Sequence, residues 1–162
     1  ARRSVMDLRH GSLETRDLGG ALSELAEQMT TGTSLCATVR TVGSTRSLER
    51  SAEHHLLRIG LEALTTAVKH SGATLVDVEL RFDDDAVHLA VRDNGTGFAE
   101  TGLEGAPGHF GLRGIRERVD KLGGTLTLEN RPPGGAVVAV SVPLRNREPR
   151  GRNSRELLSS VP

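Results

Sequence analysis

The chain has 162 residues, and its 21 Lys and Arg balance its 21 Asp and Glu, with one Cys and three Phe but no Trp or Tyr. This length suits one ordinary domain, and the zero net charge argues against a dedicated nucleic-acid binder or a binder of acidic membranes. A single Cys excludes a disulfide framework and a multi-cysteine metal site, and no apolar run reaches the roughly 18 residues of a membrane span. We therefore expect a globular domain that contacts neither nucleic acid nor membrane directly.

The first half of the chain is mainly helical in its pattern. Residues 1–12 have the composition of the last turns of a helix. Apolar residues at helical spacing predict an amphipathic helix over 18–30 and a longer one over 48–70, which Gly72 ends. The longer helix carries most of the polar residues considered below.

A strand is predicted between these two helices. Residues 33–42 are rich in β-branched side chains and roughly alternate in polarity. Cys36 falls in this strand, where a buried thiol is the usual outcome. No neighbouring base or cation is present to activate it, so we expect Cys36 to be inert.

The second half alternates with a period of two residues, which predicts two hairpins. The predicted strands are 76–82 and 87–93, then 125–130 and 136–142. Between the hairpins, residues 94–110 form a glycine-rich loop and residues 112–122 a short helix.

This order of elements predicts an α+β fold. Helices on one face of a mixed, mostly antiparallel sheet give a two-layer α/β sandwich. Residues 13–144 would form this domain, and the polar residues 145–162 a disordered tail.

A carboxylate and two glycines follow the strand 87–93. Asp93 can accept a hydrogen bond from an amino group, and Gly95 and Gly97 allow a ligand to approach the backbone closely. An ordinary turn is the alternative, because Asp-Asn-Gly sequences are common in turns.

A second glycine set, Gly108, Gly111 and Gly114, leads into the short helix. The free N–H groups of a helix N-terminus attract phosphate, and Arg113 and Arg116 can add positive charge. A flexible linker is the alternative here.

The long helix places three polar residues in a row. Glu62, Thr66 and Lys69 lie within about 60° of one another on a helix that turns 100° per residue. A carboxylate, a hydroxyl and an ammonium group suit a metal–triphosphate ligand. A solvated helix face with ordinary ion pairing is the alternative.

In this order, the three motifs resemble the ATP-binding domain of sensor histidine kinases. That domain belongs to an ATPase superfamily shared with DNA gyrase, heat-shock chaperones and mismatch-repair proteins. Residues 57–73 and 111–124 most resemble the kinases partnered with response regulators of the LuxR/NarL type. The resemblance covers residues 1–144.

The resemblance implies a role for each matching residue. Asp93 would hold the adenine amino group, Glu62 and Lys69 would be catalytic, and Glu62 and Thr66 would bind Mg²⁺. The implied ATP contacts are Thr66, His70, Asp93, Gly95, Gly97, Gly108, Gly111, Leu112 and Gly114.

The resemblance also implies a function for the whole chain. It would transfer the γ-phosphoryl group of ATP to a histidine outside this chain, on the dimerisation region whose last helix ends in residues 1–12. A LuxR/NarL-type response regulator would receive the group. The domain would lie in the cytoplasm, with or without an inner-membrane anchor on its parent protein.

The sequence departs from the family pattern in three places. Thr66 replaces the metal-binding Asn, and Ala136 replaces a Thr near the base. No His is followed by an acidic residue, as the phosphoacceptor would be, and we expect structural or surface roles for His54 and His55. The first two departures favour an alternative, a degenerate nucleotide-binding module that signals without kinase activity. A serine kinase of the same fold, acting on anti-sigma-antagonist proteins, fits the segment Asp7-Leu8-Arg9 less well.

Overall fold

The computed structural model describes residues 17–99 and 110–145. The helices in this part of the chain are α2 (Leu18–Thr30), α3 (Arg50–His70) and α4 (Phe110–Lys121). The strands are β1 (Cys36–Val42), β2 (Leu75–Phe82), β3 (Ala86–Asp93), β4 (Thr125–Asn130) and β5 (Ala136–Pro143). The expectations for residues 1–12, for Gly108 and for the tail beyond Arg145 lie outside the described residues.

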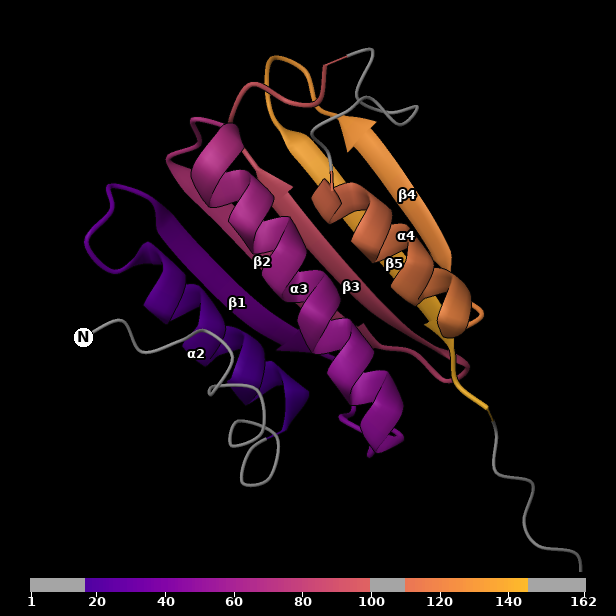
Figure 1. The fold of residues 1–162 in the computed structure, drawn as a ribbon. Coiled ribbons are helices and arrows are strands. Elements are labelled where there is room, and N and C mark those ends of the chain that lie inside the picture. The colour runs from indigo at the N-terminus through magenta and orange to yellow at the C-terminus, as the bar shows by residue number, and fades with distance from the viewer. Residues whose placement is uncertain (1–16, 100–109, 146–162) are drawn as a thin grey trace, which may run out of the picture.

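The strands form one sheet in the order β1-β2-β3-β5-β4. β1 pairs with β2 in parallel, and every other neighbouring pair is antiparallel. α2, α3 and α4 all lie on the same face of this sheet (Figure 1). The predicted two-layer α+β sandwich is therefore confirmed.

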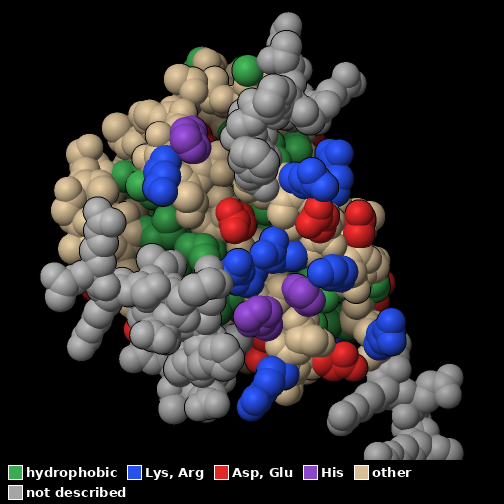
Figure 2. Space-filling model, viewed as in Figure 1, with side chains coloured by type: hydrophobic (Ala, Val, Ile, Leu, Met, Phe, Trp, Pro, Cys, Tyr) green, Lys and Arg blue, Asp and Glu red, His purple; other side chains and the backbone are tan. Residues whose placement is uncertain are grey.

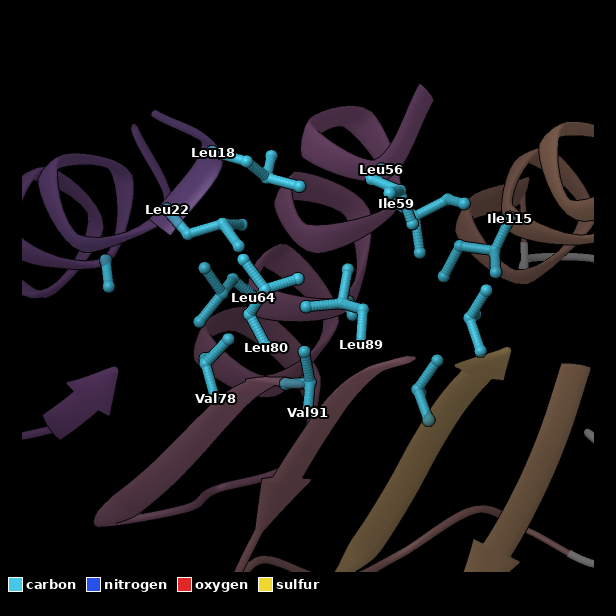
Figure 3. Packing of buried hydrophobic residues seen from close by; sticks show 14 of the residues in the cluster. Leu18, Leu22, Leu56, Ile59, Leu64, Val78, Leu80, Leu89, Val91 and Ile115 are labelled. Atoms are coloured by element: carbon cyan, nitrogen blue, oxygen red, sulfur yellow. The ribbon is translucent and has the colours of Figure 1, made fainter. Parts of the chain in front are cut away.

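The hydrophobic core lies between the helices and the sheet (Figure 3). Val78 and Leu80 of β2 are fully buried and pair with Val91 and Leu89 of β3. Leu64 of α3 is also fully buried against this layer. Complete burial of such a side chain contributes about 1.5–3 kcal/mol. The core thus holds α3 against the middle of the sheet and fixes the direction of its polar face.

The opposite face of the sheet is open and carries ion pairs. Arg40 of β1 lies 2.7 Å from the Glu79 carboxylate and 3.4 Å from that of Asp77, both on β2. Arg92 of β3 reaches Asp77 at 3.4 Å. These exposed or half-buried pairs join neighbouring strands, and each contributes little to stability, typically about 0–1 kcal/mol.

Cys36 lies on this open face, so the prediction of a buried thiol is wrong. Side chains alternate along a strand, and Cys36 shares its direction with Thr38 and Arg40. The helices cover only the other face, toward which Ala37 and Val39 point.

The first strand begins three residues later than predicted, because a turn occupies the preceding residues. Gly32 has a φ of 78°. The hydroxyl of Thr33 donates to the carbonyl of Thr30 at 2.7 Å and accepts the N–H of Leu35 at 3.2 Å. The bounds of the other predicted helices and strands agree with the structure to within two residues.

Candidate functional site

Three predicted site residues form a polar stripe on α3, consisting of Glu62, Thr66 and Lys69. Glu62 and Thr66 are half-buried and Lys69 is exposed. The Thr66 hydroxyl donates to the carbonyl oxygen of Glu62 at 3.0 Å. Because that bond uses its only proton, the hydroxyl offers lone pairs, and no donor, to a ligand.

The polar stripe faces the beginning of α4 at Gly111. A β-carbon added at Gly111 would lie 3.4 Å from Thr66 Oγ1 and 3.6 Å from Glu62 Oε2. The two oxygens therefore converge on the first turn of α4, whose backbone N–H groups lack partners within the helix. This brings together a carboxylate, a hydroxyl and a helix N-terminus, which attracts anions.

The segment Asp93–Gly97, here called the glycine turn, folds against the end of α3. The N–H of Gly95 donates to Asp93 Oδ1 at 2.8 Å, and the N–H of Thr96 donates to the Ser71 carbonyl at 2.8 Å. A β-carbon at Gly95 would clash with that same carbonyl. Glycine is therefore required here by close approach of two backbone segments.

The Asp93 carboxylate keeps one oxygen available. Its Oδ1 accepts the Gly95 N–H, whereas Oδ2 has no hydrogen-bond partner among the described residues. The side chain is half-buried at the end of β3. It can accept a hydrogen bond from a ligand amino group without giving up the bond that shapes the turn.

Asn130 fixes the residue that follows the glycine turn, Phe98, and this role was not predicted from the sequence. Its Oδ1 accepts the Phe98 N–H at 2.6 Å, and its Nδ2 donates to the Phe98 carbonyl at 2.9 Å. Gly97 beside it has a φ of 78°, a conformation that favours glycine. The only sequence signal is the polar residue at the end of a strand, which does not identify a partner 32 residues away.

Asn94 ties the same turn to the sheet. Its Oδ1 accepts the N–H groups of Thr74 and Leu75, each at 2.9 Å, and its Nδ2 donates to the Thr74 hydroxyl at 2.9 Å. These three bonds fix the side chain, so Asn94 positions the turn.

α3 connects the two parts of the candidate site. The polar stripe lies on its C-terminal half, and Ser71, which anchors the glycine turn, follows its last residue. The site therefore extends along α3 from Glu62, beside Gly111, to Asp93 at the far end. An acceptor for an amino group stands at one end and an anion-attracting region at the other.

The remaining predicted ATP contacts differ in what they can offer. The Leu112 side chain is buried in the core, so only its backbone can face a ligand. His70 is exposed at the end of α3. Gly114 lies against Arg118, whose Nη1 donates to the Gly114 carbonyl at 2.8 Å.

Ala136 is buried at the start of β5, next to the end of β3 where Asp93 lies. Val137 pairs with Arg92, which places Ala136 beside that strand end. The preceding Gly135 has a φ of 126°, and a β-carbon there would clash with the Asp93 carbonyl. A hydroxyl at position 136 would lie near the glycine turn, and the Ala methyl group supplies none.

Residues 17–99 and 110–145 contain neither a ready-made metal cluster nor a membrane-spanning helix. No group of three or more His, Cys, Asp or Glu side chains is arranged to hold a metal ion there. In the same ranges, no helix has the length and apolar character to cross a membrane.

Several known proteins are similar to this chain. The sequence pattern of the family described as histidine kinase-, DNA gyrase B-, and HSP90-like ATPase matches residues 51–146. The nitrate/nitrite sensor protein NarQ of Escherichia coli K12 is 36% identical over 131 residues, which are 80% of this chain and 23% of NarQ. The signal transduction histidine-protein kinase/phosphatase DegS of Brevibacillus brevis is 30% identical over 147 residues, which are 91% of this chain and 38% of DegS. The chain thus spans less than half the length of either relative.

A solved structure has the same fold. The histidine kinase domain of the blue-light activated kinase EL346 from Erythrobacter litoralis matches with a TM-score of 0.63 and 24% identity. The match covers 78% of this chain and 61% of that domain. It independently confirms the α+β fold class.

Proposed function

Because the chain belongs to the family of histidine kinase-, DNA gyrase B- and HSP90-like ATPases, we propose that it is the ATP-binding catalytic region of a two-component sensor histidine kinase. It transfers the γ-phosphoryl group of ATP to a histidine outside this chain. A response regulator of the LuxR/NarL type then receives the group, as expected from the resemblance of residues 57–73 and 111–124 to kinases with such partners. We place the domain in the cytoplasm, next to that regulator.

The observation that carries this proposal is the arrangement along α3. Asp93, with Oδ2 available, stands at one end, and the oxygens of Glu62 and Thr66 converge on Gly111 at the other. Adenine has an amino group that Asp93 can hold, and the triphosphate extends toward the N-terminus of α4. Gly95 and Gly97 allow the tight glycine turn that holds Asp93 at the end of β3.

The polar stripe acts on the phosphate end. The Lys69 ammonium group, in the last turn of α3, pairs with the phosphate oxygens nearer the base, whereas Glu62 and Thr66 face the terminal phosphate. In the transfer, the bond from the γ-phosphorus to the ADP oxygen breaks and a bond to the acceptor ring nitrogen forms. That nitrogen attacks with its lone pair, and the Glu62 carboxylate accepts the proton that the acceptor ring then loses from its other nitrogen. Positioning and charge stabilisation thus supply the catalysis.

The residues present fit a magnesium ion. Mg²⁺ in triphosphate sites takes one or two protein oxygens together with phosphate oxygens and water. Glu62 Oε2 and Thr66 Oγ1 are two such oxygens, and both face the same point near Gly111. When bound, Mg²⁺ supplies positive charge to the phosphates. The Thr66 hydroxyl is held back toward the Glu62 carbonyl, which makes it a weaker ligand than a longer amide side chain.

A second candidate function is a degenerate nucleotide-binding module that signals without transferring phosphate. Two observations favour it. The Thr66 hydroxyl is engaged with the backbone of its own helix, and Ala136 supplies no hydroxyl near the base. In this case ATP binds, but Mg²⁺ hardly changes its affinity.

One experiment tests both functions. ATP is titrated with and without Mg²⁺, and radiolabelled ATP is then supplied with and without a separate dimerisation hairpin. A kinase binds ATP, leaves the chain alone unlabelled and gives the hairpin an acid-labile, base-stable label. ATP binding without transfer identifies the degenerate module. The absence of ATP binding contradicts both functions.

A further inference from the structure

Asn130, the last residue of β4, connects the glycine turn to the sheet. Its backbone lies in the sheet, where it pairs with Ala136 of β5. Its side chain bonds both backbone groups of Phe98, since Oδ1 accepts the N–H at 2.6 Å and Nδ2 donates to the carbonyl at 2.9 Å. An amide group that pairs in this way imitates a residue of a neighbouring strand. This two-bond contact is here called the Asn130 clamp.

The loop from β4 to β5, which follows Asn130 directly, packs against the glycine turn. A β-carbon at Gly135 would clash with the Asp93 carbonyl. One at Gly134 would lie 3.0 Å from the Gly95 carbonyl oxygen. The two main chains therefore lie too close together for side chains between them. Because Asn130 is at the base of this loop, its clamp holds the end of the glycine turn against the same support.

The glycine turn is thus supported on two sides. On one side, the N–H of Thr96 donates to the Ser71 carbonyl at 2.8 Å, and on the other side lies the Asn130 clamp. Gly95 stands between these supports, and its N–H donates to Asp93 Oδ1 at 2.8 Å. This bond sets the rotation of the carboxylate, so the direction of the available Oδ2 depends on where the turn holds Gly95.

The Asn130 clamp matters because the turn has a conformationally free residue near its end. Gly97 has a φ of 78° and, without a β-carbon, can adopt many other backbone conformations. The bond to Ser71 is made before Gly97, at Thr96, and the clamp acts after it, at Phe98. Without the clamp, only the packing of the Phe98 ring against the core would hold this end of the turn.

We propose that Asn130 is a positioning residue for nucleotide binding. By joining Phe98 to β4, it keeps the Gly95 N–H in place and so directs the Asp93 carboxylate toward the adenine amino group. This inference rests on the proposed function and adds a residue of β4 to the base end of the site. Because the Asn130 clamp acts at that end, its loss should weaken every adenine ligand by the same factor, whatever the number of phosphates.

The test compares adenosine with ADP, because electrostatic attraction of the phosphates can hide an effect at the base. Figure 2 shows Lys, Arg and His side chains gathered over the helices, and such groups attract any ligand that carries phosphate. Adenosine has no charge, so its affinity reports on the base end alone. Both affinities are measured by NMR titration of the folded chain at constant ionic strength.

Asn130→Ala removes the clamp from an exposed position outside the core, so the variant should fold. Its affinities for adenosine and ADP should fall by the same factor, about three- to tenfold, because two hydrogen bonds are lost. The Phe98 N–H should also exchange with solvent faster than in the wild type. Thr127→Ala, at an exposed position of the same strand, is the matched control and should leave both affinities unchanged.

A double-mutant cycle shows whether Asn130 acts through Asp93. Asp93→Asn removes the acceptor for the adenine amino group, after which the direction of that side chain no longer matters. Asn130→Ala should therefore change the ADP affinity of the Asp93→Asn variant by less than about twofold. An equal loss with and without Asp93→Asn would show that Asn130 acts independently of Asp93, and would overturn the proposal.

The wild type provides a measurement that needs no variant. If the Asn130 clamp supports ADP binding, then ADP must stabilise the clamp by the same factor, because coupling between two equilibria is reciprocal. Saturating ADP should therefore slow the exchange of the Phe98 N–H about three- to tenfold.

The outcomes separate this inference from the proposed function. If the wild type binds neither adenosine nor ADP, the proposed function fails and the inference fails with it. If the wild type binds both, and Asn130→Ala binds them equally well or loses affinity for ADP alone, only the inference fails. Unchanged exchange of the Phe98 N–H in saturating ADP also overturns the inference and leaves the proposed function standing.

Discussion

The two ends of the candidate site are built in different ways. The glycine turn is fixed by contacts to its backbone. The main chains of Ser71 and Gly135 pack against it, and the Asn130 side chain forms two hydrogen bonds with the backbone of Phe98, directly after it. The other end of the candidate site, proposed to hold the phosphates, is formed by the half-buried or exposed side chains of the polar stripe, near the start of α4. Substitutions in the glycine turn should therefore reduce both the stability of the fold and the affinity for ATP. Substitutions in the polar stripe should change ATP binding or phosphate transfer and leave the stability of the fold nearly unchanged.

The largest effect is expected at Asp93, where a substitution can separate binding from folding even within the glycine turn. Asp93→Asn keeps an oxygen for the Gly95 N–H but turns the other acceptor into a donor that faces the adenine amino group. Loss of a charge-assisted bond, with a donor left unpaired, should cost about 2–4 kcal/mol of ATP binding. Calorimetry measures this loss. Asp84→Asn, at a fully exposed turn, is the control, and equal ATP affinity in both variants would remove Asp93 from the site.

The next effect concerns the fold itself. Gly95→Ala drives a methyl group into the Ser71 carbonyl. The required backbone shift should lower the free energy of unfolding by about 1–3 kcal/mol and also weaken ATP binding. Urea unfolding and calorimetry on the same protein measure the two effects. A variant as stable as the wild type would show that the turn is not fixed by this contact.

A Gly-to-Ala substitution beside the polar stripe, at Gly111, should raise stability, whereas Gly95→Ala in the glycine turn lowers it. An added methyl group at Gly111 lies at ordinary contact distances from Thr66 and Glu62. Ala is favoured over Gly in a helix, and less so in the first turn, so Gly111→Ala should raise the free energy of unfolding by about 0.5 kcal/mol or less. The methyl group also occupies the point on which the two oxygens converge, and ATP affinity should fall. If Gly111→Ala is less stable than the wild type, or binds ATP with unchanged affinity, then the two ends of the site do not differ in the way described above.

The smallest effect on the fold is expected at Thr66. Thr66→Asn should change the free energy of unfolding by less than about 0.5 kcal/mol, because the two residues have similar helix propensities. The longer amide reaches beyond the Glu62 carbonyl, so the Mg²⁺ dependence of ATP binding and the rate of phosphate transfer should rise. ATP titrations across Mg²⁺ concentrations and single-turnover transfer measure both. If the wild type already depends strongly on Mg²⁺ and Asn reduces that dependence, Thr66 is a working ligand and the degenerate alternative fails.

The elements with a clear period were predictable from the sequence. The alternation of Val76, Val78 and Leu80 with charged residues defined β2 to within one residue, because only a strand places such residues on opposite faces. The helical spacing of Leu56, Ile59 and Ala63 defined α3 in the same way. The motif around Asp93 was recognisable only in combination with the second glycine set and the polar residues of the long helix, because Asp-Asn-Gly alone is common in turns.

What the sequence did not reveal depends on the folded arrangement. The side of the sheet that Cys36 faces is decided by which face the helices cover, and the alternation of β1 alone leaves this open. The partners of the glycine turn are distant in sequence, so nothing local marks Ser71, Asn130 or Gly135 as parts of the site. The beginning of β1 was placed too early because β-branched Thr residues also suit the turn that precedes it.

The unbroken course of α3 has a consequence for which nucleotides the site accepts. Nine residues separate Glu62 from Ser71, which corresponds to about 14 Å along the axis. In the proposed site, a nucleoside monophosphate bound at the Asp93 end would stop short of Glu62, and each further phosphate would extend the ligand toward it. Such a site would distinguish adenine nucleotides by the length of their phosphate chain, and the backbone of one helix would set that length. Leu56, Ile59 and Leu64, fully buried beneath it, keep the helix from sliding and so keep the length constant.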